Sequence, residues 1–257
     1  MNIAEYERAI KRLMNWIQKA PLWQERWSAV HDQHIGEMPK ALEIPSERFD
    51  ALLDVLGADM LSAIEPVIAE DFLTHRFAPD GANVVDAYLT APGWKENAVS
   101  RAYMEALRDS HMAFYEIKGA EGDKHWVVQE SGTDAAPIHA IDPQADADYD
   151  AGSHMGARLL TIEGQQLLTD GVYFFQPDET AGVLEALRLE REKGQAELPA
   201  FAASQGLTLD ETTQPVLERR LAASALTAAW LMPMCVDALR DPEVQDALDT
   251  AEATSEL

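Results

Sequence analysis

Hydrophobic residues recur at helical spacing through the first 110 residues of the chain. In residues 1–20 an apolar stripe repeats every three or four positions with charged residues opposite, as in an amphipathic helix. Prolines and glycines separate similar stripes, and residues 78–81 (APDG) predict a turn. Further helices are predicted over residues 22–38, 46–56, 60–77, 84–89 and 95–110. We therefore expect an N-terminal helical region over residues 1–110.

The hydrophobic pattern changes near His111. Runs of strand length replace the helical stripes, with turn residues between them, and Glu163-Gly164-Gln165 predicts a hairpin turn between two of the runs. The predicted strands are residues 112–118, 125–130, 137–141, 155–162 and 166–175. Five short strands at this spacing favour a small antiparallel, barrel-like sheet over residues 111–177.

Helical spacing returns at Asp178, which suits a helix N-cap. Gly194 is expected to end that helix, and residues 194–212 to form a loop with at most one short helix. Pro215 then opens the last helical stretch, which Pro233 and Pro242 are expected to break. The predicted fold class is α+β, with the sheet between the N-terminal helices and a C-terminal helical region over residues 178–257.

Composition excludes several classes of protein. Apolar residues make up 47% of the 257 residues, enough for a sizeable core, and a single cysteine excludes a disulfide framework or a zinc site of several thiolates. That cysteine, Cys235, lies in an apolar stretch and is predicted to be a packed, unreactive thiol. The longest uncharged stretch, residues 221–236, is shorter than the roughly 20 residues of a membrane span and predicts a buried helix or a subunit interface. The N-terminus lacks an apolar signal region, so we expect a cytoplasmic protein.

The formal net charge is −25, and acidic residues exceed basic ones in all three predicted regions. Phosphates attract lysine and arginine, so direct binding to nucleic acids or to anionic membranes is disfavoured. Two interpretations of the acidity remain. It is a solubilising surface, or it imitates DNA in order to occupy a basic partner.

Three groups of residues are candidate metal or catalytic sites. His31 and His34 share a helix face and can bind one metal, but no third ligand is evident, so ordinary histidines are the simpler interpretation. Histidines and acids of the sheet region can serve a metal or proton transfer only if they meet at one rim. These are His111, His125, His139 and His154, with Glu116 and Glu130.

A group of aspartates can converge on calcium, but the segment lacks the glycine and glutamate of an EF-hand loop, so a solvated loop is predicted. These aspartates are Asp142, Asp146, Asp148 and Asp150. The chain carries no phosphate-binding glycine motif, no nucleophile elbow and no CxxC pair. The sequence therefore names no catalytic residue and predicts no cofactor and no bound metal.

Residues 88–117 and 156–175 resemble uncharacterised bacterial proteins related to SEC-C-motif-containing proteins. The cysteine-rich SEC-C motif itself is absent here, and so is the zinc binding that it would bring. The resemblance implies a bacterial protein but no particular reaction. The matched residues are Gly93, Trp94, Lys95, Glu96, Arg101, Tyr103, Glu105, Ala106, Leu107, Arg108, Ser110, Met112, Tyr115, Glu116, Ala157 and Arg158.

Within this segment, Arg101, Glu105 and Arg108 fall on one helix face, where Glu105 can pair with either arginine. Trp94 is expected to pack beneath the start of the helix. The segment is an architectural joint between helix and sheet, or a docking face for an anionic ligand or partner. That face comprises Trp94, Arg101, Glu105 and Arg108. Aromatic residues around the sheet are expected mostly in the core, or else to stack a ligand ring.

These observations favour a non-enzymatic protein-interaction or regulatory module whose partner is another protein. One alternative is a metal-dependent or acid–base enzyme that uses histidine, aspartate or glutamate near the sheet. A second alternative is an acidic inhibitor that mimics DNA. A homo-oligomer is compatible with each.

Overall fold

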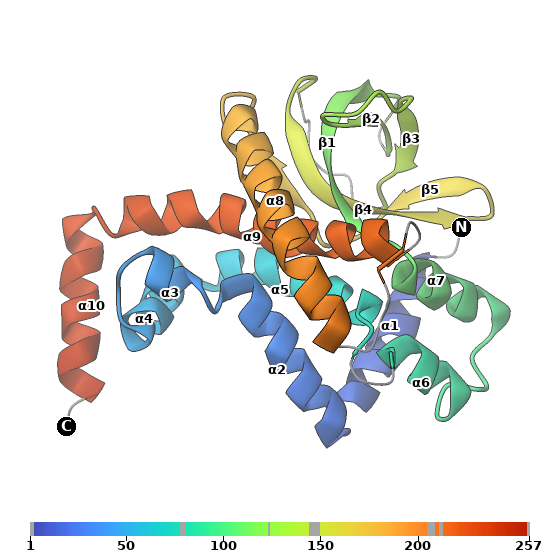
Figure 1. The fold of residues 1–257 in the computed structure, drawn as a ribbon, viewed down its shortest axis with the longest axis horizontal. Coiled ribbons are helices and arrows are strands. Elements are labelled where there is room, and N and C mark those ends of the chain that lie inside the picture. Colours follow the sequence, from blue (N-terminus) through green and yellow to red (C-terminus); the bar gives the residue numbers. More distant parts are fainter. Residues whose placement is uncertain are drawn as a thin grey trace.

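The computed structural model describes residues 3–77, 81–122, 124–143, 150–204, 209–210 and 213–255. Helices lie on both sides of a central sheet in the chain order, so the predicted α+β class is confirmed (Figure 1). Before the sheet come helices α1 (Ile3–Ile17), α2 (Pro21–Ile35), α3 (Met38–Ala41), α4 (Ser46–Leu56), α5 (Ala58–Thr74), α6 (Val84–Thr90) and α7 (Ala98–Arg108). After it come α8 (Thr180–Ser204), α9 (Thr213–Ala238) and α10 (Pro242–Ser255).

The sheet closes into a small barrel. The strands are β1 (Met112–Ala120), β2 (His125–Glu130), β3 (Ile138–Ile141), β4 (His154–Ile162), β5 (Gln165–Leu168) and β6 (Tyr173–Phe175). The barrel order is β1-β2-β3-β5-β4, closed by a pairing of β4 with β1, and β6 adds to β4 outside the ring. The pairings are antiparallel except β3 with β5, which is parallel. This connectivity is that of an OB-type barrel, a fold that does not by itself assign a function.

Alternation along the strands divides their side chains between two cores. On β1, Ala113, Tyr115 and Ile117 point into the barrel, while Met112 and Phe114 join the core shared with the helices. Strand β4 alternates in the same way. Successive residues of a strand face opposite sides, so β1 and β4 are buried on both faces, whereas β2 is buried only on the face that carries Trp126 and Val128. This difference explains why the sequence of β1 and β4 is more continuously apolar than that of β2.

Helix α9 lies between the barrel and the N-terminal helices. It packs against α2 and α5 on one side and against β1 and β6 on the other (Figure 1). Gly156 on β4 lets the helix approach, because a Cβ there would lie 3.1 Å from Leu226 Cδ1. At the far end, Arg48 on α4 donates to Asp249 Oδ1 at 3.0 Å and to Gln245 Oε1 at 2.6 Å, which holds α10.

Three predictions about the elements were wrong. Residues 166–175 form two strands rather than one, because the chain turns at Gly171 against α5. Helix α8 continues through Gly194 to Ser204, and Pro233 lies inside α9 without ending it. Helices α8 and α9 pack against each other, and this packing outweighs the local cost of glycine and proline. Of the predicted turn and calcium loop, residues 78–80, Asp146 and Asp148 lie outside the described residues.

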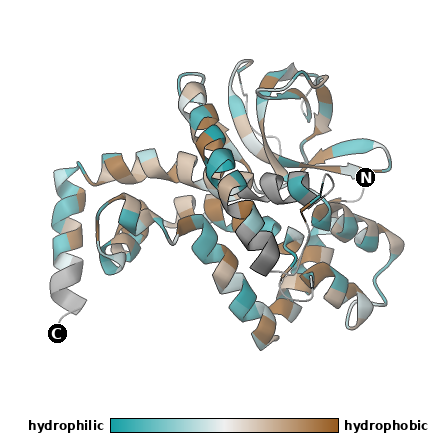
Figure 2. Ribbon diagram, in the orientation of Figure 1, coloured by the Kyte–Doolittle hydropathy of each residue, from teal (hydrophilic) through white to brown (hydrophobic). Residues whose placement is uncertain are grey.

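Hydrophobic and hydrophilic residues interleave along the helices (Figure 2). In the described part of the chain no single helix is long and apolar enough to cross a membrane. One pair, Ala222–Ala238 with Pro242–Thr250, reaches that length and composition only together, and it bends by 90° at the break.

Candidate functional site

The candidate histidine pair on α2 does not form a shared site. His34 is buried and makes two hydrogen bonds, at 3.2 Å to Asp71 Oδ2 and at 2.7 Å to Thr227 Oγ1. His31, one turn earlier, is only half-buried. Among the residues that the structure describes, no group of three or more His, Cys, Asp or Glu side chains is placed to hold a metal ion.

The histidines of the sheet region have separate partners. His139 on β3 lies 3.0 Å from Glu121 Oε2. His154 on β4 lies 3.0 Å from Thr180 Oγ1 and stacks on Phe114, and its burial lowers its pKa. Of the remaining candidates, His125 is exposed on β2, His111 is half-buried before β1, Glu116 pairs with Lys118, and Glu130 ends β2. The described residues therefore give no support to a catalytic centre at these histidines.

Trp94 lies in solvent rather than beneath the start of α7, where we expected it. It is 64% exposed. The place below the first turn of α7 is taken by Glu5 of α1, which accepts hydrogen bonds from Asn97 Nδ2 at 2.9 Å and from Ser100 Oγ at 2.8 Å. A hydrogen bond from Arg8, followed by those from Ser100, Asn97 and Arg12, lowers the pKa of Glu5 to about 2.

The loop that carries Trp94 is held at both ends. The Glu96 carboxylate accepts two hydrogen bonds from Arg12, at 2.8 and 2.6 Å, and one from the Tyr88 hydroxyl at 2.8 Å. The bond from Arg12 is the main cause of a lowered pKa at Glu96. On the other side of Trp94, Gly93 lies flat on the ring of Tyr88, where a Cβ would lie 2.5 Å from Cε1. Trp94 is thus presented on a loop of fixed conformation.

The three charged residues of the predicted docking face differ in their pairing. Arg108 binds Asp86 at 2.5 Å and Asp109 at 2.6 Å, instead of the Glu105 that we considered. In the described part of the chain neither Arg101 nor Glu105 makes a side-chain ion pair. Lys95 is exposed, with its Nζ 5.0 Å from the Trp94 ring centre.

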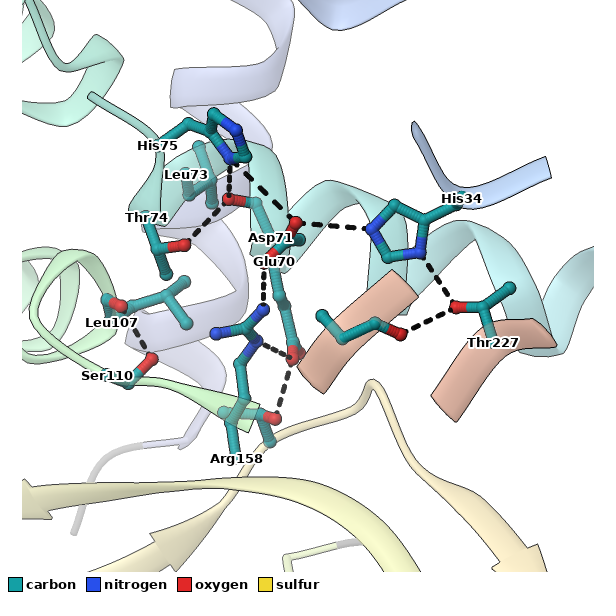
Figure 3. A network of polar contacts seen from close by, with 12 residues as sticks. His34, Glu70, Asp71, Leu73, Thr74, His75, Leu107, Ser110, Arg158 and Thr227 are labelled. Atoms are coloured by element: carbon teal, nitrogen blue, oxygen red, sulfur yellow. Dashed lines mark hydrogen bonds and ion pairs between the residues drawn. The ribbon is translucent and has the colours of Figure 1, made fainter. Parts of the chain in front are cut away.

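A buried polar network joins the helices to the barrel, and the sequence did not reveal it (Figure 3). Arg158 on β4 is 1% exposed, and its Nη2 donates to Asp71 Oδ1 on α5 at 2.6 Å. From Asp71 the network continues through His34 to Thr227, whose hydroxyl lies 3.0 Å from the Tyr173 hydroxyl. Elements far apart in sequence therefore meet at one set of hydrogen bonds.

Two adjacent acids at the end of α5 behave oppositely. Burial raises the pKa of Glu70 to about 7, although Arg158, Thr169 and Gly171 favour its ionised form. Burial also raises the pKa of Asp71, but the hydrogen bond from His34 and the charge of Arg158 outweigh it and hold that pKa well below its usual range. The available signal was this pair of acids within an apolar helical run, where charged groups are buried only with partners.

Glu70 accepts hydrogen bonds from Thr169 Oγ1 at 2.7 Å and from the Gly171 amide at 3.0 Å, and it also borders a cavity of about 300 Å³. Helices α1, α5 and α7 line this cavity together with β5 and the segment that follows it. Tyr6 and Tyr103 stack at its wall, with ring centres 4.4 Å apart. The cavity also borders Glu7, Lys11 and Asp170.

The fold and these sites define an α+β protein in which helices enclose one side of an OB-type barrel. In comparisons with known proteins, no family model, no curated protein and no solved structure matches the chain. The resemblance to proteins related to SEC-C-motif proteins stays a prediction.

Proposed function

We propose that this chain is a protein-interaction module that binds an acidic segment of another protein bearing an apolar or aromatic side chain. The binding surface is the docking face defined above, extended by Lys95. The observation that carries the proposal is Trp94, which is 64% exposed on a loop held by Glu96 and Gly93.

A fixed, exposed tryptophan suits an interaction anchor. Tryptophan and arginine are enriched among the residues that dominate binding energy at interfaces. A loop that already has its bound conformation loses little conformational entropy when a partner docks. Arg12 and Tyr88 hold the Trp94 loop through Glu96. The loop is therefore already ordered by folding, before a partner binds.

Local charge favours an acidic partner, although the whole chain is strongly acidic. Lys95 and Arg101 make no ion pair with a described side chain, so both are available to a docked segment, and Glu105 is the one acid of the docking face itself. At physiological salt, charges more than about 8 Å apart are largely screened, so these two residues act on a docked segment while distant acids do not. We expect binding to weaken at very low salt, where repulsion by the net charge of −25 extends further.

Selection from a phage-displayed random peptide library tests this proposal. We expect the selected peptides to combine an apolar or aromatic residue with two or more acids. Their affinity should fall at least about tenfold for Trp94→Ala, the loss of about 1.4 kcal/mol or more that is typical of an anchor residue. Arg101→Glu should also weaken them, whereas Leu189→Ala, at another exposed apolar residue, should not.

Peptides without acidic residues, or peptides that bind Trp94→Ala unchanged, would overturn the proposal. Light scattering of the free protein measures its oligomeric state and gives a second test. If Trp94→Ala converts a dimer into a monomer, the face is an interface between copies of this chain, and the proposed partner is wrong. The melting temperature of each variant shows that the fold is retained.

A further inference from the structure

The cavity beside Glu70 is separate from the docking face and has its own chemistry. It lies where the N-terminal helices meet the barrel, and its volume of about 300 Å³ is at the lower end of the range for small-molecule sites. The Glu70 side chain, only 10% exposed, forms part of the wall. A ligand that enters here meets a carboxylate already oriented by Thr169 and Gly171.

Negative charge exceeds positive charge around this cavity. Three of its lining residues are acidic, namely Glu7, Glu70 and Asp170, against the single Lys11. Arg158 faces Glu70 from behind, at 3.8 Å, but its closer contact is with Asp71 at 2.6 Å. The acids also act on one another. Burial raises the pKa of Asp170 first, and the charge of Glu7 raises it further.

The remaining walls are apolar and aromatic. The stacked rings of Tyr6 and Tyr103 form one part, and Leu73, Leu107 and Leu167 form another. An apolar body fits against such side chains. A bare metal ion does not fit as well, because the described carboxylates are not gathered closely enough to ligate one.

We infer that this cavity binds a small organic cation, an ammonium group on an apolar body. The ammonium group lies among Glu70, Glu7 and Asp170, and the apolar part lies along the tyrosines and leucines. Because a cation favours the ionised carboxylate, binding releases the proton that buried Glu70 holds near neutral pH. Affinity should therefore rise as the pH rises from 6 to 8.

Titration calorimetry of the full chain with hexylammonium chloride tests the inference. We expect a dissociation constant of about 1 mM or tighter, since seven non-hydrogen atoms permit that affinity. Hexanol has the same apolar body without the charge and should bind at least about tenfold more weakly. Equal binding of hexanol, or saturable calcium binding without hexylammonium binding, would overturn the inference.

Two substitutions test where the cation binds. Asp170→Asn removes the charge of a cavity-lining acid with little change in side-chain shape, and it should weaken hexylammonium binding by about fivefold or more. Glu70→Gln should weaken it more strongly and should abolish proton release, measured in buffers of different ionisation enthalpy. The matched control Glu25→Gln alters an exposed acid on α2 and should stay within about twofold. Unchanged binding in both Asp170→Asn and Glu70→Gln would show that the cation binds elsewhere.

Discussion

Arg158 and Asp71 form a buried ion pair that fastens the barrel to helix α5. The two residues are 87 positions apart in sequence, and Arg158 Nη2 lies 2.6 Å from Asp71 Oδ1. His34 Nε2, at 3.2 Å, lies near the second carboxylate oxygen of Asp71. The pair is thus removed from water, but hydrogen bonds compensate for the lost solvation. Because its geometry is specific, the pair fixes the position of the barrel relative to the helices.

Replacing Arg158 by glutamine should destabilise the protein strongly. The change leaves the Asp71 carboxylate buried without its main counter-charge, for which about 3–5 kcal/mol is typical. Urea unfolding followed by circular dichroism measures the loss. The control is Arg188→Gln, because Arg188 binds Glu185 and Glu192 on the surface, where removal costs at most about 1 kcal/mol. Equal effects of the two changes would contradict this account.

Glu70 should make the free energy of unfolding depend on pH. Its pKa rises from 4.5 to about 7 on folding, so the folded state binds more protons than the unfolded state between those values. The contribution is fully present below pH 4.5 and is lost as the pH rises through about 7, by up to about 3 kcal/mol. Denaturant titrations at several pH values should show this decline in the wild type. Glu70→Gln should lack it, and the same slope in both proteins would contradict the assignment.

The regular elements were largely predictable because their signals are local. Glu163 and Gly164 both have positive φ, 52° and 79°, as expected at the hairpin that the sequence predicted. The apolar runs of β1 and β4 predicted buried strands, and their alternation in the structure supplies two cores. The helical stripe over residues 1–20 likewise became α1, with Leu13 and Ala9 fully buried.

Features that depend on distant residues were not predictable. No local pattern pairs Arg158 with Asp71, and the parallel contact of β3 with β5 follows only once the barrel closes. Trp94 was expected beneath the start of its helix, but Glu5, which comes from the distant helix α1, occupies that position and accepts hydrogen bonds from Asn97 and Ser100. Gly194 signals a helix end locally, yet the packing of α8 on α9 overrides it.

The hydrogen bonds of Glu96 should control the mobility of the Trp94 loop. Glu96→Gln removes the charge that Arg12 pairs with, and loss of a charged hydrogen bond costs about 1.5–3 kcal/mol. Hydrogen exchange in residues 91–97 should accelerate, and affinity for peptides selected on the docking face should fall. Glu37→Gln, at an exposed pair with Lys40, should change neither. Unchanged exchange in Glu96→Gln would show that the loop is held by other contacts.

Cys235 should be unreactive in the folded protein. It is fully buried in α9, and burial raises the pKa of its thiol to about 11, so very little thiolate exists at neutral pH. Ellman's reagent at about pH 8 should react slowly with the native chain and rapidly in guanidinium chloride. A rapid reaction without denaturant would mean that the helix around Cys235 opens readily.

Gly171 should not tolerate a side chain, because its backbone lies directly against α5 beside Glu70. A Cβ there would lie 2.7 Å from Glu70 Oε2 and 3.0 Å from the Cα of Val67, and the backbone of α5 cannot yield as a side chain can. Gly171→Ala should therefore lower the free energy of unfolding by about 1–3 kcal/mol.

Gly182 in α8 is a matched control, since a Cβ added to it would have no other atom within 4 Å. Gly182→Ala should be neutral or stabilising by up to about 1 kcal/mol, because alanine is the better helix former. Chemical unfolding of both variants decides the matter, and equal stability of the two would show that the α5 contact is looser than the distances imply.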